Sequence, residues 1–206
     1  MIALDLTRFI SFLFNLSVAG YFVYAFLFPE ATGYWLAQGG FYVFIAEFLG
    51  IFVLLLLAQA LGKKTGWTYS GDANPWLFIG VVMAMAFVFA WSLNALWAFG
   101  FFLISTVVKA FQIHYAPNAQ SEGRQAVYSL LFLLLGTFGA LFLSPLAYAF
   151  PHSVDVLSAV ARSGGAEGLA VDNPGFNAIW GLIYFLGMAF VSLKPGWLSL
   201  EQAKSA

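Results

Sequence analysis

The feature that most constrains this chain is a predominantly apolar stretch from Trp76 to His114, 39 residues long. A single helix of that length would extend about 58 Å, roughly twice the thickness of the hydrocarbon core of a bilayer. We therefore divide it at Ser92-Leu93-Asn94 into two spans joined by a tight turn. Four further stretches have the roughly 20 apolar residues that a membrane-spanning helix needs. The predicted spans are residues 9–28, 40–61, 76–92, 95–114, 126–150 and 176–193.

Composition excludes a soluble domain. Of 206 residues, 62% are hydrophobic and 8% are charged, whereas a soluble domain has about 45–50% apolar and about 25% charged residues. The hydrophobicity also excludes disorder, and a formal net charge of −1 gives no electrostatic footprint for nucleic acid. We expect one all-α domain over 1–206, a polytopic membrane helix bundle surrounded by the lipid bilayer.

Cationic side chains set the predicted orientation, because cytoplasmic loops carry an excess of Lys and Arg. With six spans and a cytoplasmic N-terminus, seven cations lie inside and only Arg162 lies outside. A single helix over 76–114 would instead place four of these cations inside and four outside. The count favours six spans with both termini in the cytoplasm. The inner cations are Arg8, Lys63, Lys64, Lys109, Arg124, Lys194 and Lys204.

Aromatic residues mark the ends of several spans. Trp76 and Trp91 are 15 residues apart, or about 22 Å along a helix, which would place one ring near each membrane interface. We expect Trp180 and Trp197 to bracket the sixth span in the same way, and Tyr42 to lie at the first outer loop.

Two local signals predict helices or their starts. Asn74-Pro75 combines a capping side chain with a proline at the first helical position. In the outer loop 151–174, apolar residues at helical spacing predict a short helix, capped by Ser153, on the outer membrane surface; a loosely ordered loop is the alternative. The acidic residues and His152 in this loop match no metal-binding spacing.

Glu47 is the one acidic residue inside a predicted span, about 10 Å from the outer end of its helix. A carboxylate in the membrane is costly unless it is paired, protonated or in contact with water. It is therefore either a proton or cation site, or a protonated carboxyl group that bonds a neighbouring helix. The candidate intramembrane partners are Asn15 in the first span and Asn94 at the outer turn.

A second polar group lies at the inner end of the fourth span. Lys109 and His114, followed by Arg124, are candidates to contact lipid headgroups or an anionic ligand. Small residues one turn apart, Ala46 with Gly50 and Gly80 with Ala84, indicate close helix packing inside the bundle or against a partner.

Three functions remain open. The chain has no cysteine and no recognisable nucleophile, metal or cofactor motif, which disfavours a lipid-active intramembrane enzyme. The interpretation we favour from sequence is a non-catalytic subunit or assembly factor that binds a membrane protein or a second copy of itself. The alternative is a small proton- or cation-coupled transporter that uses Glu47, and a cavity beside Glu47 would favour it. Small size and the absence of organelle signals indicate a bacterial plasma membrane.

The topology can be tested by thiol labelling, because the chain contains no cysteine. Cysteines introduced at Glu30 and Ala166 should react with an impermeant reagent supplied from outside, whereas one at Gly66 should not. Reaction of all three positions from the same side would contradict the six-span arrangement.

Overall fold

The computed structural model describes residues 2–60, 74–92, 96–115, 119–163 and 174–193. Within these ranges the chain is helical and contains no strand, which confirms the all-α prediction. The elements are α1 (Ile2–Leu27), α2 (Pro29–Ala60), α3 (Pro75–Ser92), α4 (Leu96–Tyr115), α5 (Ala119–Leu143), the 3-10 helix η1 (Ser144–Ala149), α6 (Pro151–Ser163) and α8 (Pro174–Leu193).

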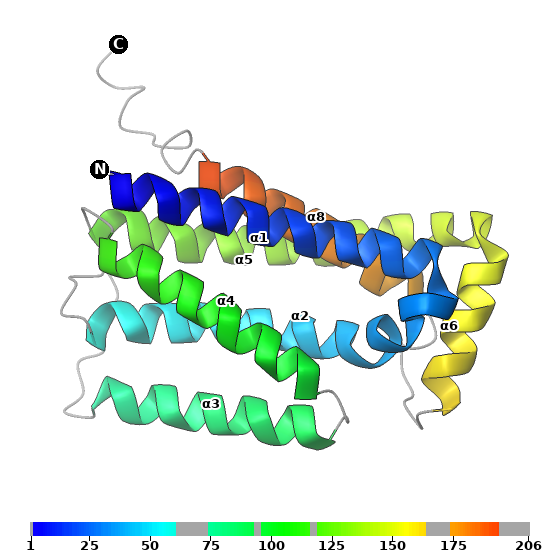
Figure 1. Ribbon diagram of the computed structural model, residues 1–206, viewed down its shortest axis with the longest axis horizontal. Helices are drawn as coiled ribbons and strands as arrows, with labels where there is room; N and C mark the ends of the chain where they lie inside the picture. The colour runs from blue at the N-terminus through cyan, green and yellow to red at the C-terminus, as the bar shows by residue number, and fades with distance from the viewer. Residues whose placement is uncertain (1, 61–73, 93–95, 116–118, 164–173, 194–206) are drawn as a thin grey trace, which may run out of the picture.

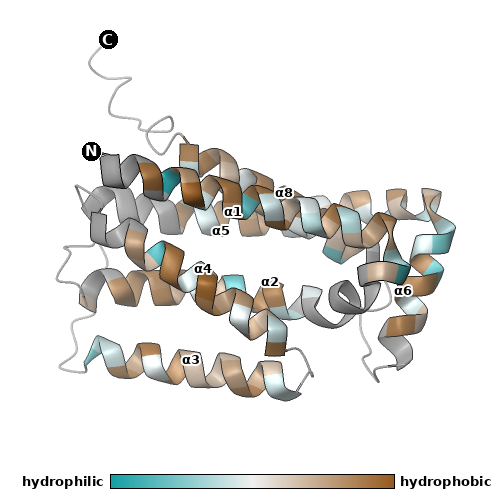
Figure 2. Cartoon of the chain, viewed as in Figure 1, coloured by the Kyte–Doolittle hydropathy of each residue, from teal (hydrophilic) through white to brown (hydrophobic). Residues whose placement is uncertain are grey.

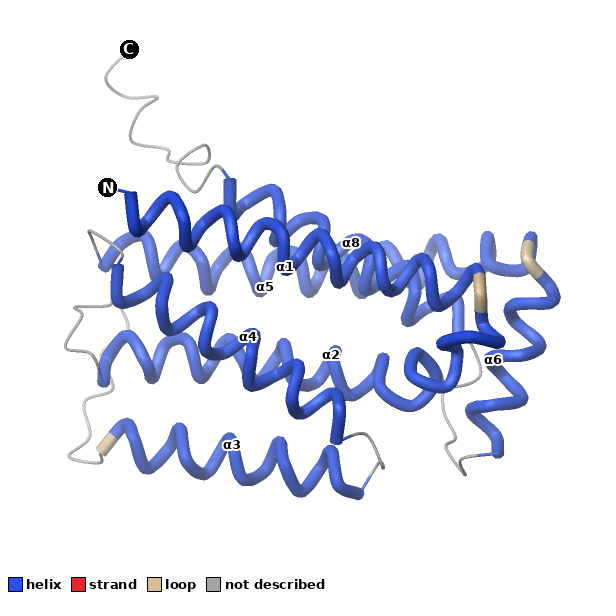
Figure 3. The backbone as a smooth tube through the Cα atoms, viewed as in Figure 1, coloured by secondary structure: helices blue, strands red, loops and turns tan. Residues whose placement is uncertain are grey.

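The long helices form a bundle with two distinct ends. Helix α1 begins and α8 ends at one end, and α6 lies across the other (Figures 1 and 3). We call these the terminal end and the α6 end. Helices α3 and α4 are separate and run in opposite directions (Figure 1), so the 39-residue apolar stretch is divided as predicted. The turn itself, with Asn94, lies outside the described residues.

The outer surface of the bundle is apolar (Figure 2). Large hydrophobic side chains such as Leu77, Met85 and Phe142 are exposed along its helices, and this surface suits lipid rather than water. Within the described residues, four helical stretches are long and apolar enough to cross a bilayer, and Tyr42–Leu57 and Leu96–Phe111 are shorter apolar helices. The four are Arg8–Leu27, Pro75–Ser92, Val127–Ala149 and Gly175–Leu193.

Helix α2 begins earlier than its predicted span, 40–61. It starts at Pro29, so the segment 29–39 that we expected to be an outer loop is helical. Proline fits the first helical position because its φ is already fixed and its missing N–H would have no partner there. Glu30 in the first turn adds a negative charge that suits the helix dipole. At the start of α3, the N–H of Trp76 donates to Asn74 Oδ1 at 3.0 Å, so this predicted cap is confirmed.

The predicted span 126–150 is not one α-helix. Helix α5 ends at Leu143 and the chain continues as η1, which contains Pro145 near its start. Proline has no N–H to donate and disfavours continuation of an α-helix. The short helix expected in the following loop is present as α6, although it starts at Pro151 rather than at a Ser153 cap. Leu157 on its apolar stripe is fully buried, as that stripe predicts.

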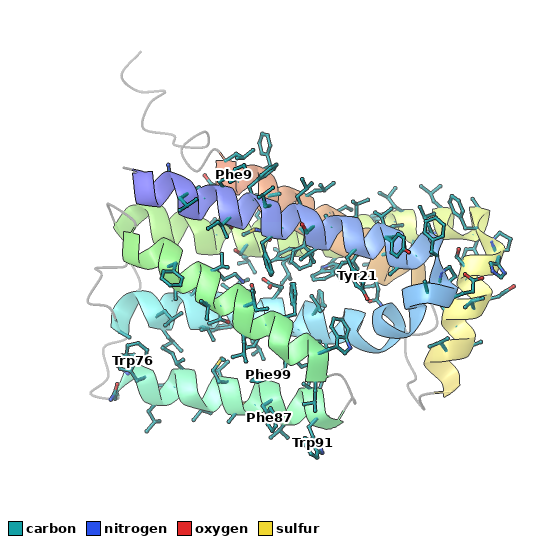
Figure 4. All side chains as sticks on the ribbon, in the orientation of Figure 1. Phe9, Tyr21, Trp76, Phe87, Trp91 and Phe99 are labelled. Atoms are coloured by element: carbon teal, nitrogen blue, oxygen red, sulfur yellow. The ribbon has the colours of Figure 1, made fainter. Side chains whose placement is uncertain are left out.

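Of the three aromatic predictions, one agrees with the structure and two were wrong. Trp76 and Trp91 lie exposed at opposite ends of α3, as expected (Figure 4). Trp180, however, is fully buried in the core and stacks on Tyr184 with ring centroids 5.2 Å apart. Tyr42 is also buried, and its hydroxyl donates to the carbonyl of Ala86 at 2.9 Å. Both rings fill space between helices, a role that sequence position at a span end does not distinguish from interfacial anchoring.

Helix α8 packs between α1 and α5 through glycines. A Cβ atom at Gly181 would overlap the ring of Phe22 on α1, and one at Gly187 would overlap Phe132 on α5. These glycines therefore let aromatic side chains rest directly on the α8 backbone. In contrast, Gly80 and Ala84 of α3 face outward, and a Cβ at Gly80 would meet no atom within 4 Å.

The substitution Gly181→Ala tests this packing. Phe22 is buried and cannot move freely, so we expect overpacking to cost about 1–3 kcal/mol, lowering the melting temperature in detergent. Gly20→Ala is the matched control, because a Cβ there meets nothing within 4 Å and alanine favours a helix. Equal melting temperatures for the two variants would contradict the close α1–α8 contact.

Candidate functional site

Glu47 lies inside the bundle with three hydrogen-bond donors around its carboxylate. Its Oε1 accepts from Ser105 Oγ at 3.0 Å, and its Oε2 accepts from Lys109 Nζ at 2.7 Å and from Tyr184 OH at 2.7 Å. The Glu47 side chain is only 2% exposed and that of Lys109 is 12% exposed. Ion pairing and hydrogen bonding together offset the cost of removing this carboxylate from water.

Three helices supply these groups, and local spacing explains how. Ser105 and Lys109 are four residues apart on α4, so both point from one face of that helix. Glu47 comes from α2 and Tyr184 from the buried face of α8. Gly50, one turn beyond Glu47, leaves room for the lysine: a Cβ there would be 3.2 Å from Lys109 Nζ. The small pair Ala46 and Gly50 is buried, which fits close approach of α4 to α2.

The predicted site residues are distributed differently from our expectation. Glu47 faces the bundle interior, and among the described residues its direct partners are Lys109, Ser105 and Tyr184 rather than Asn15. Asn94 lies outside the described residues. Lys109 therefore does not extend to the headgroup region with His114 and Arg124, because its ammonium group binds a carboxylate in the core. The side chains of His114 and Arg124 lie outside the described part of the structure.

A signal for the pair is present in the sequence. Glu47 and Lys109 are the only Asp, Glu, Lys or Arg residues within the six predicted spans. Two opposite charges alone in an apolar bundle are expected to meet, because each would otherwise be buried without a counterion. The sequence does not identify Tyr184 as a partner in the same way, since a tyrosine within a span can equally well fill space between helices.

A small cavity adjoins the ion pair, with room for about one water molecule. Its polar lining comes from Glu47, Ser105, Lys109 and Tyr184, together with Ser11 and Asn15 of α1. Asn15, a candidate partner of Glu47, lines the same cavity but does not bond Glu47 directly. It donates through Nδ2 to the Ser11 carbonyl at 2.7 Å and to Ser11 Oγ at 3.3 Å.

These hydrogen bonds continue along α1 and α8. Ser192 Oγ donates to the Met188 carbonyl at 2.8 Å, so its oxygen is left to accept from Ser11 Oγ, 3.0 Å away. A hydroxyl group both donates and accepts, whereas a carboxylate only accepts and an ammonium only donates. The hydroxyls of Ser105 and Tyr184 could therefore accept from Glu47 after it gains a proton, so the cluster can satisfy either protonation state.

A second ion pair lies at the α6 end. His152 Nε2 on α6 contacts Glu30 Oε1 at the start of α2, and both side chains are exposed. The hydrogen bond from His152, with a further contribution from the Glu30 backbone, lowers the pKa of Glu30. This contact ties α6 to α2. Among the described residues, no group of three or more His, Asp or Glu is placed to hold a metal ion.

Comparison with protein-family models, with curated proteins and with solved structures finds no significant match.

Removing one partner of the ion pair should be more harmful than removing both. Lys109→Met leaves the Glu47 carboxylate without its counterion, and breaking a buried pair costs about 3–5 kcal/mol. The double variant Glu47→Gln/Lys109→Met keeps similar volume and leaves no buried charge. We expect it to melt at a higher temperature in detergent than Lys109→Met alone. A double variant whose destabilisation equals the sum of the single effects would contradict direct pairing.

Proposed function

We propose that this protein is a small multi-pass membrane transporter in which Glu47 binds a proton or a competing cation. The observation that carries the proposal is the Glu47–Lys109 ion pair beside a polar cavity within an apolar bundle. Intramembrane ionisable groups are expensive, and they commonly mark ion or proton pathways. A merely structural contact between α2 and α4 could be made by apolar side chains of similar volume without burying any charge.

The chemistry of the pair supports exchange. A proton or small cation that arrives at the carboxylate replaces the attraction of Lys109, so binding there changes the contact between α2 and α4. Ser105 and Tyr184 keep the carboxyl group hydrogen-bonded before and after that change. Binding at one site is thereby linked to the relative position of two helices, which is the requirement for coupled transport.

We further infer six spans, with both termini on the cytoplasmic side of a bacterial plasma membrane. The shorter apolar stretches of α2 and α4 lie within the same bundle as the four longer ones, which supports counting them as spans. Lys109 contacts Glu47 and no longer counts as an inner-face cation. The remaining predicted distribution, six inside against one outside, keeps a clear positive-inside bias.

A non-catalytic subunit is the second candidate, and the exposed face of α3 favours it. Helix α3 packs against α2 and α4 at the edge of the bundle. Gly80 and Ala84 are exposed on it, and small residues one turn apart allow a further helix to approach closely. In that case Glu47 would serve stability alone.

Proton flux separates the two candidates. The purified protein is reconstituted into liposomes with a pH-sensitive dye trapped inside, and gradients of Na⁺, K⁺ and protons are imposed in turn. We expect flux from the natural sequence and its loss in Glu47→Gln, which keeps shape but cannot bind the proton. Glu30→Gln is the matched control, because Glu30 is an exposed carboxylate remote from the cavity.

Folding is checked by the melting temperature of each variant. Flux that is unchanged by Glu47→Gln would contradict the proposed role. Absence of flux from the natural sequence under every gradient would favour the subunit.

A further inference from the structure

The polar side chains that line the cavity lie at the level of Glu47 and to one side of it along the bundle axis, and a cluster of aromatic rings lies on the other side. Tyr184 marks the level of the carboxylate on α8. Toward the terminal end, α8 carries Ser192, and the neighbouring α1 carries Asn15 and Ser11. Toward the α6 end, α8 carries Trp180, which packs against Phe22 of α1. Next to the carboxylate, hydroxyl and amide groups lie in one direction and aromatic rings in the other.

Aromatic rings close the direction toward the α6 end. Phe44 of α2 contacts Trp180 edge-to-face with centroids 5.0 Å apart, and Phe22 lies 5.8 Å from Phe185. Trp180 also stacks on Tyr184 itself. We call Phe22, Phe44, Trp180 and Phe185 the aromatic seal. Three of them are at most 2% exposed: Phe22, Trp180 and Phe185. Such closely packed interiors leave no continuous space for water.

The residues that line the cavity lie at the level of the carboxylate and toward the terminal end. Of its lining residues on α1, α2 and α4, none lies nearer the α6 end than Glu47 and Ser105. Ser11, Asn15 and Lys109 lie on the terminal side, and the hydrogen bond between Ser11 and Ser192 continues the polar surface toward the end of α8. A water molecule in this cavity has several polar partners, which a buried water requires.

We propose that Glu47 exchanges protons with the terminal end alone, through water held between Ser11, Asn15 and the carboxylate, and that the aromatic seal blocks the α6 end. In this step a hydronium ion gives its proton to a Glu47 oxygen and becomes water, while Lys109 keeps its charge. The reverse step returns the proton to the same side. This inference rests on the proposed function and adds its direction: proton exchange takes place with the terminal end, which the predicted topology makes cytoplasmic.

Single cysteines test the route, since no native cysteine interferes. Ser11→Cys is nearly isosteric and lines the cavity, whereas Val43→Cys lies one turn from Glu47 toward the α6 end and is equally buried. Each variant is treated with Ag⁺ in chloride-free medium, a thiol-reactive ion of about the size of a water molecule, supplied from one face in intact cells and from the other in inverted vesicles. Glu30→Cys, at the exposed α6 end, reports which face is which.

We expect Ser11→Cys to react from the terminal face, and Val43→Cys to stay unmodified from either face until the protein is denatured. A sealed thiol reacts only through local opening, so its rate should be lower by about tenfold or more. Reaction of Ser11→Cys from the α6 face, or of Val43→Cys at a similar rate, would overturn the proposal. Asn15→Cys is the second probe: failure of both cavity positions to react in folded protein would also overturn it.

The labelling result is independent of proton flux. It reports which end of the bundle admits water, whatever Glu47 does there. Unchanged flux in Glu47→Gln with labelling from the terminal face would therefore reject the transport role and keep the one-sided cavity. Loss of flux in Glu47→Gln with labelling from the α6 face would reject only the direction of access.

Discussion

The ion pair between Glu47 and Lys109 is the contact on which the arrangement of the bundle depends. Neither charge is tolerable alone in an apolar interior, so α2 and α4 must keep the register that brings the two side chains together. The hydroxyls of Ser105 and Tyr184 complete the carboxylate shell, and the second of these extends the constraint to α8. Nonspecific apolar packing fixes few registers between long helices in lipid, whereas a single satisfied charge pair selects one. The same contact that specifies the fold thus supplies the chemically reactive group.

Around this pair, α8 acts as the central packing element. Its glycines admit aromatic rings from α1 and α5, and its own Trp180 and Tyr184 turn inward. The phenylalanine rings need no hydrogen-bond partners and can pack densely, which makes them a good barrier to water, whereas the buried indole N–H of Trp180 has no hydrogen-bond partner among the described residues. Ser11 and Asn15 of α1 and Ser192 of α8 lie on the remaining side of the carboxylate. Closely packed aromatic rings on one side of the carboxylate and polar side chains on the other, both supplied largely by α1 and α8, make the site asymmetric.

Much of the helical framework could be predicted, because the length of an apolar stretch is limited by bilayer thickness. The division of residues 76–114, the cap at Asn74 and the amphipathic α6 followed from local rules. Partners could not be assigned in the same way. Lys109 resembles an interfacial anchor by its position near a span end, and the one sequence signal against that interpretation is that Glu47 is the only other charge within the predicted spans. The prediction that Trp180 lies at a membrane interface was wrong for a similar reason. A ring near a span end can turn toward lipid or toward the core, and the neighbouring helix determines which. The extension of α2 to Pro29 was hidden because residues 29–39 are compatible with both helix and loop.

The length of α2 has a consequence for the surrounding lipid. Its 32 residues extend about 48 Å, whereas the hydrocarbon core measures about 30 Å. Helix α6 packs against α2, and the contact between His152 and Glu30 joins α6 to the first turn of α2. In a bilayer, the first turns of α2 would stand among the headgroups, with α6 as a collar at that depth. The protein would then set its own immersion depth, and membranes of different thickness would have to thin or thicken around it.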